Sequence, residues 1–151
     1  MNYYNEQLNK SLSEVDKMWW SRFFENNINW NVNINQEYKG IDAFLNGKKV
    51  QFKLREQYYK DILIEFSHSN GEKGWINKRD QECVYVIFGW RPKNIICIID
   101  WEKLIILWKE NQVKWISKYK IKKAINKNKV TLNVAIPFKE MEEILVFREL
   151  N

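Results

Sequence analysis

The sequence predicts an α/β fold in which a central mixed β-sheet is flanked by α-helices, within a single domain over residues 1–151. Three observations predict it: an Asn-Gly turn signal between two apolar-rich runs, two nearly continuous apolar runs, and helical periodicity near the amino end and after residue 100. A sheet with helices packed on its faces buries the apolar side of every such element. Hydrophobic residues make up 45% of the chain, which is enough to build a core.

Apolar spacing predicts the first elements. Residues 6–26 form a helix, because apolar side chains recur three and four positions apart between Leu8 and Phe23. Residues 28–36 alternate apolar side chains with asparagine, which is the periodicity of a strand. Two hairpin strands and a third strand follow, at about 41–45, 49–55 and 62–66.

The second half of the chain continues the alternation of strands and helices. The apolar runs 84–88 and 95–99 are typical of strands covered on both faces. Asp100 is a good N-cap for a helix through Glu110. The other expected segments are a loop at 67–73, a short helix at 75–81, a helix at 112–120, a lysine-rich linker at 118–129, a strand at 130–136 and a last helix that Pro137 opens.

Charge and composition restrict the partners. A formal net charge of +6 and a pI near 9.2 favour a polyanion such as nucleic acid. No apolar run is long enough to cross a bilayer and the amino end lacks a signal-peptide core, so we expect a cytoplasmic protein with no membrane partner. Cys83 and Cys97 lie in apolar runs without metal-binding spacing and are predicted to be small buried hydrophobes. No glycine-rich phosphate loop is present.

The predicted hairpin gathers polar side chains on one face. With Asn46 and Gly47 as the two central residues of a type I′ turn, counting outward places Asp42 opposite Gln51. Lys53 lies on the same face, diagonally from Asp42. The alternate positions point to the other, buried face; they are Val50, Phe52 and Leu54.

Asp42, followed after a hairpin by Gln51-Phe52-Lys53, resembles the core of the PD-(D/E)XK nuclease superfamily, in a phage-type variant with Gln-x-Lys. The strand 61–66 and the segment 74–78 are similar to those that follow in phage-like members, so the resemblance covers about residues 38–88. It implies a restriction-endonuclease-like fold and an endodeoxyribonuclease, a hydrolase that cuts DNA phosphodiester bonds with Mg²⁺ or Mn²⁺. Such an ion lowers the pKa of a bound water and neutralises developing charge.

The resemblance also implies roles for individual residues. Asp42 is the principal metal ligand, Gln51 offers its carbonyl oxygen or holds a metal-bound water, and the backbone carbonyl of Phe52 assists. Lys53 orients or deprotonates the attacking water, or stabilises the phosphorane. Glu65 on the third strand is a candidate second metal ligand. The alternative is an exposed hairpin face on which Asp42 and Lys53 form a weak surface ion pair.

Contacts to nucleic acid and a further acid complete the predicted site. Glu14 or Asp16 would supply an acid from the first helix, as that helix often does in this family. A solvated linker is the alternative for the lysines of 118–129. The candidate nucleic-acid contacts are Arg55, His68, Trp75, Lys78, Lys122 and Lys123.

Two other functions stay open. A glutamine at position 51 removes one negative charge, which is compatible with a catalytically degraded nuclease-fold module that binds nucleic acid or a partner protein without cleavage. A small interaction or inhibitor protein that uses exposed aromatic side chains is the third candidate. DNA, or RNA, is the expected partner, cleavage of both strands favours a homodimer, and the Asn, Lys and Ile bias fits a phage, plasmid or mobile-element origin.

Overall fold

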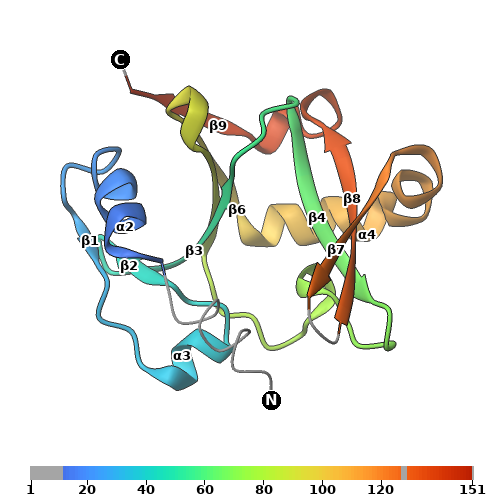
Figure 1. Cartoon of the computed structure of the whole chain (residues 1–151), viewed down its shortest axis with the longest axis horizontal. Helices are drawn as coiled ribbons and strands as arrows, with labels where there is room; N and C mark the ends of the chain where they lie inside the picture. Colours follow the sequence, from blue (N-terminus) through green and yellow to red (C-terminus); the bar gives the residue numbers. More distant parts are fainter. Residues whose placement is uncertain (1–11, 127–128, 151) are drawn as a thin grey trace.

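A computed structural model describes residues 12–126 and 129–150, and over these residues the strands form two separate sheets (Figure 1). The larger, six-stranded sheet has the order β1-β2-β3-β5-β6-β9, with bounds Ile28–Asn29, Ala43–Leu45, Lys48–Arg55, Tyr85–Trp90, Ile95–Asp100 and Val146–Glu149. The smaller, three-stranded sheet has the order β4-β8-β7, with bounds Asp61–His68, Lys129–Pro137 and Ile121–Asn126.

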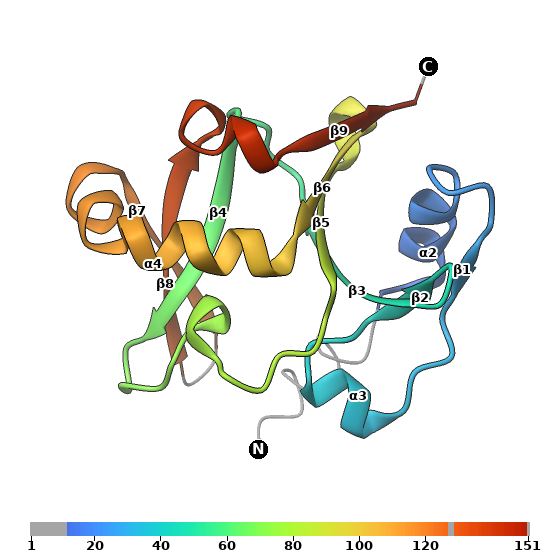
Figure 2. The ribbon, with the colours of Figure 1, turned by 180° about the vertical axis from the view of Figure 1, so that it is seen from behind.

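The larger sheet is mixed, which confirms the coarse fold class. Strands β3 and β5 run parallel, and the other neighbours in both sheets are antiparallel. The long helix α4 (Trp101–Lys118) lies behind the smaller sheet in Figure 1, crosses in front of it in Figure 2, and begins next to β6 of the larger sheet. Two short helices, α2 (Glu14–Ser21) and α3 (Ile34–Tyr38), lie at the β1–β2 side of the molecule.

The Asn-Gly hairpin forms as predicted. Asn46 and Gly47 have φ values of 50° and 80°, the positive values that a type I′ turn needs, and Ala43 pairs with Val50. Residue alternation along β3 therefore puts Gln51 on one face and Val50 on the other.

Each face of the larger sheet has its own core. On one face, Trp19 and Trp20 of α2 pack against Val50, Phe52 and Ile87. On the other face, the strands β5 and β6 pack against β4, β8 and α4, in a cluster that includes Trp75, Trp90, Trp108, Trp115 and Leu104. Helix α4 begins as predicted, because Asp100 Oδ1 accepts a hydrogen bond of 3.0 Å from the backbone N–H of Lys103. Both cysteines are buried and free, which confirms that prediction.

The third strand does not join the hairpin, contrary to the single central sheet that we expected. Strand β4 pairs with β8 in the smaller sheet, with Ile62 opposite Ile136. Ile62 and Ile64 are fully buried against the α4 side of the core. Apolar periodicity identifies a strand and its buried face, but it does not identify the strand beside it.

The first helix differs from its prediction over 6–26. Within the described residues it covers Glu14–Ser21, and the chain then turns through Glu25 and Asn26, which have φ values of 52° and 62°. Val15 and Met18, expected in the apolar stripe, are 66% and 70% exposed, whereas Trp20 is fully buried. The two adjacent indoles of Trp19 and Trp20 decide which side of the helix packs.

Five further predictions differ from the structure. The predicted strand 28–36 is only the two residues of β1, and a capping box at Asn33 and Gln36 then starts α3. The predicted linker 118–129 contains β7, and the two helices predicted between 101 and 120 are one continuous α4. The short helix 75–81 is a 3-10 turn over Trp75–Asn77, and the predicted last helix consists of two 3-10 turns followed by β9.

The packing of α2 on β5 yields a test of the fold. A Cβ at Gly89 would lie 2.5 Å from Trp20 Cη2 and 2.7 Å from Trp19 Cζ3, so Gly89→Ala should destabilise the protein by about 1–3 kcal/mol. Thermal unfolding should then show a melting temperature lower by roughly 3–10 °C. Val84→Ala, at a position 41% exposed just before the same strand, is the control and should change stability by less than about 0.5 kcal/mol. Equal melting temperatures for the two variants would contradict the packing.

Candidate functional site

A polar stripe runs along the α4-facing side of β3. Gln51, Lys53 and Arg55 alternate there, beside the buried apolar side chains of β5. The end of β3 is tied to the start of β4, because Arg55 Nη1 donates to Asp61 Oδ1 at 2.6 Å and to the Asp61 carbonyl at 3.1 Å. The stripe therefore lies between two strands that belong to different sheets.

Asp42 lies just before β2, where that strand stops pairing with β3. Its backbone N–H donates to the Val50 carbonyl at 2.8 Å, and its Oδ2 accepts a hydrogen bond of 2.7 Å from the Phe52 backbone N–H. The side chain thus replaces the strand partner that Phe52 lacks on this edge. In a strand, the N–H and the C=O of one residue point to the same edge, so the Phe52 carbonyl also points toward Asp42.

Lys53 is the cation of the site. Its Nζ lies 4.6 Å from the centre of the Trp75 ring, a cation–π contact. Burial lowers the pKa of Lys53, although the carboxylates of Asp42 and Glu65 act in the opposite direction. Burial likewise raises the pKa of Asp42 to about 6, against the opposing effects of the Phe52 N–H and of Lys53. Burial thus brings the pKa values of Asp42 and Lys53 closer together.

Gln51 is held by an indole. It is 9% exposed, and its Oε1 accepts a hydrogen bond from Trp75 Nε1. An indole N–H only donates, so the bond fixes the amide with its oxygen toward Trp75. Gln51 therefore positions Trp75 over Lys53, a role that sequence reasoning missed because 24 residues separate the two partners. The carbonyl oxygen keeps a second lone pair that can face an ion or a water.

Trp75 lines the site from within. The side chain is 5% exposed and packs against Phe88 and Trp101. Its ring is covered by Lys53 and by core residues, so it does not offer a face on which a base could stack. This corrects the expectation that Trp75 is a nucleic-acid contact.

Glu65 approaches Lys53 from the smaller sheet. Its Oε1 accepts a hydrogen bond of 3.1 Å from the Trp75 backbone N–H and lies 3.3 Å from His68 Nε2. The His68 side chain is 10% exposed, and its Nδ1 is buried without a partner among the described residues. His68 therefore fixes Glu65 and does not lie in an exposed loop. Glu65 lies close enough to Lys53 for its negative charge to act on the Lys53 pKa.

Three of the predicted nucleic-acid contacts line one cavity of about 370 Å³; they are Arg55, Lys122 and Lys123. Leu63 and Asn133 also line it, and Asn133 is the strand partner of Glu65, so the cavity lies beside the site. Lys122 Nζ lies 4.7 Å from the centre of the Tyr59 ring. Arg55 already pairs with Asp61 and is only partly available to a phosphate.

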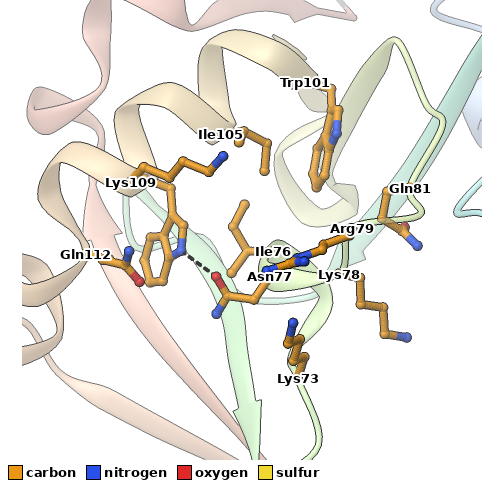
Figure 3. A pocket seen from close by; sticks show the side chains of 11 residues that line it. Lys73, Ile76, Asn77, Lys78, Arg79, Gln81, Trp101, Ile105, Lys109 and Gln112 are labelled. Carbon is orange, nitrogen blue, oxygen red and sulfur yellow. Dashed lines mark hydrogen bonds between the residues drawn. The ribbon is translucent and has the colours of Figure 1, made fainter.

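Lys78, the remaining predicted contact, is exposed and lines a larger cavity of about 710 Å³ between α4 and residues 73–81 (Figure 3). It also reaches the site electrostatically, because its positive charge contributes to the lowered pKa of Lys53.

The acids of the first helix are not part of the site. Helix α2 packs on the Val50 and Phe52 face of the sheet, opposite the stripe that carries Lys53. Glu14 pairs with Lys17 at 3.5 Å, and Asp16 pairs with Arg91. The prediction that Glu14 or Asp16 supplies an acid is therefore wrong for the described structure.

The donor set fits a hard divalent cation. Mg²⁺ prefers oxygen ligands and keeps several waters, so one or two carboxylates and a carbonyl are sufficient. Asp42 and the Phe52 carbonyl meet at one edge, and the raised pKa of Asp42 means that a cation there would relieve an unfavourable negative charge. The described residues contain no cluster of three or more His, Cys, Asp or Glu side chains that could hold a metal ion.

Comparisons with models of protein families, with curated proteins and with solved structures found no match to this chain. Among the described helices, none is both long enough and apolar enough to span a membrane.

Asp42→Asn should stabilise the metal-free protein at pH 8 but not at pH 4. Because the pKa of Asp42 rises from 3.8 to about 6 on folding, the unfolded state ionises first and stability falls as pH rises between these values. Above pH 6, ionisation of Asp42 lowers the free energy of unfolding by its full amount, about 1–3 kcal/mol. Asparagine stays neutral and keeps an oxygen for the Phe52 N–H. Urea unfolding with EDTA at both pH values measures the difference, and an equal gain at both would contradict the raised pKa.

Proposed function

We propose that the protein is a metal-dependent nuclease that hydrolyses phosphodiester bonds of DNA, with a restriction-endonuclease-like core of the PD-(D/E)XK type. The observation that carries the proposal is the junction at β2 and β3, where the Asp42 carboxylate bonds to the Phe52 N–H next to the half-buried Lys53. The strand order β2-β3-β5 supports the same proposal, because β3 continues past the short β2 and leaves its Phe52 N–H to the Asp42 carboxylate.

Asp42 and the Phe52 carbonyl would hold Mg²⁺ or Mn²⁺, with Glu65 and the free lone pair of Gln51 available to waters around it. When bound, such an ion makes a water more nucleophilic and neutralises charge on the phosphate. Lys53 would hold the attacking water through Nζ, and its lowered pKa leaves a larger fraction of the amine neutral, and so able to accept a proton, than in an ordinary lysine. Gln51 and Trp75 keep that nitrogen in place.

The substrate side of the proposal rests on charge. The net charge of +6 and the cations of the cavity beside Glu65 favour a phosphate backbone. We propose DNA in the cytoplasm as the partner, with RNA as the related alternative, and a homodimer where both strands of a duplex are cut.

Cleavage of labelled DNA with Mg²⁺ tests this function. Asp42→Asn and Lys53→Met should each lower the rate by about 10²–10⁴-fold, because each removes a group that acts on the ion, the water or the phosphate. Lys48→Ala, an exposed lysine of the same hairpin, removes the same charge as Lys53→Met and should leave the rate unchanged. EDTA should stop cleavage by the wild type. Cleavage that persists in EDTA or in Lys53→Met would show that the metal-dependent site at Asp42 and Lys53 is not its source.

A binding module without cleavage is the second candidate, and the position of Gln51 favours it. The glutamine removes a negative charge from the site and engages its oxygen with Trp75 Nε1. This candidate predicts salt-dependent DNA binding by the wild type and no cleavage with any divalent ion.

Gln51→Glu tests whether position 51 lies beside the bound ion. The added carboxylate still accepts the Trp75 N–H and adds charge beside Asp42, so Mn²⁺ should bind roughly tenfold more tightly. Calorimetric titration with Mn²⁺ measures the change. Asn35→Asp, an exposed position on α3, adds the same charge elsewhere and should leave Mn²⁺ affinity unchanged. Equal affinities in the two variants would mean that position 51 does not face the ion.

A further inference from the structure

The larger cavity, of about 710 Å³, lies between α4 and residues 73–81 and has a cationic rim (Figure 3). Lys109 extends from α4 on one side, and Lys73, Lys78 and Arg79 come from the opposite segment. None of the side chains that line it is a carboxylate. The rim therefore concentrates four positive charges around one opening.

None of these four cations forms an ion pair among the described residues, whereas several other basic side chains of the surface do. Lys39 and Lys49 both pair with Glu82, and Lys129 pairs with Glu72. Among the described residues, no carboxylate lies within ion-pair distance of any of the four rim cations. Like charges gathered without counterions repel one another and attract a polyanion.

The floor of the cavity is apolar and rigid. Ile76 and the indoles of Trp101 and Trp108 are buried, and Ile105 is half-buried. Asn77 is fixed because its Oδ1 accepts a hydrogen bond of 3.0 Å from Trp108 Nε1 (Figure 3). A cavity of this size with a cationic rim suits the flexible backbone of unpaired nucleotides, whose phosphates meet the rim. The volume is that of a pocket for a small ligand, so a duplex cannot enter it.

The cavity adjoins the candidate catalytic site. The 3-10 turn Trp75–Asn77 separates them, with Trp75 over Lys53 on one side and Ile76 and Asn77 in the cavity on the other. Lys78 links the two, because it lines the cavity and its positive charge lowers the pKa of Lys53. The cavity and Lys53 are therefore separated by a single turn of the chain.

We propose that the cavity binds a single strand of nucleic acid through its phosphodiester backbone, at nucleotides that flank the bond held at Asp42 and Lys53. The proposal rests on the proposed function for its position in the reaction, but the binding itself is measurable without metal. It predicts a preference for substrates with an unpaired end or an unpaired segment.

Fluorescence anisotropy in EDTA tests it, with a labelled oligodeoxythymidylate and with a duplex of equal length. The rim variant combines Lys73→Gln, Arg79→Gln and Lys109→Gln. Lys78 is left unchanged because its charge also affects the pKa of Lys53. The control removes three exposed lysines that line neither cavity, with Lys93→Gln, Lys103→Gln and Lys139→Gln. Both variants have the same net charge, and thermal melting verifies that both fold.

The rim variant should bind the single strand roughly tenfold more weakly than the control at low salt. Between about 50 and 200 mM NaCl, the slope of log affinity against log salt should fall by about 2, since three phosphate contacts are lost. The wild type should prefer the single strand over the duplex. Equal binding by the two variants, a preference for duplex, or equal competition by polyglutamate would each overturn the proposal.

The outcomes for the cavity and for the nuclease are separate. Loss of single-strand binding in the rim variant, with no Mg²⁺-dependent cleavage by the wild type, would support the cavity and reject the nuclease. Cleavage that depends on Lys53, with unchanged single-strand binding in the rim variant, would support the nuclease and reject the cavity.

Discussion

The candidate site depends on keeping opposite charges close together where little water reaches them. Lys53 carries its ammonium against the Trp75 ring, and the carboxylates of Asp42 and Glu65 offset part of the cost of its burial. Burial raises the pKa of Asp42 and lowers the pKa of Lys53, because the charged form of each loses solvation. Burial therefore moves the pKa values of Asp42 and Lys53 toward each other, an effect that is absent from an ordinary ion pair between two surface groups.

The architecture makes this burial feasible. Strand β2 stops early, and the freed Phe52 N–H takes the Asp42 side chain as its acceptor. Strand β4 belongs to the smaller sheet, where it pairs with β8. It places Glu65 near Lys53 of β3. Helix α4 packs against both sheets and holds them at a fixed separation, while the turn at Trp75 fills the space between them.

Sequence reasoning identified part of this site for a definite physical reason. The type I′ turn fixes the register of β2 and β3, with Ala43 opposite Val50, and alternation along β3 then puts Gln51 and Lys53 on one face. The contacts of Trp75 with Gln51 and with Lys53 escaped it, because no local rule links residues so far apart in the chain. The acids of α2 were misplaced because apolar spacing does not say which face of a sheet a helix covers.

The sequence by itself determined the hairpin, the start of α4 at Asp100, the buried cysteines and the mixed α/β class, since each follows from local backbone preference or from periodicity. Only the tertiary structure decided that β4 belongs to a second sheet, that His68 fixes Glu65, and that a cationic cavity opens beside the Trp75 turn. Those features depend on which buried surfaces meet, and many pairings of apolar surfaces satisfy the same pattern of residues.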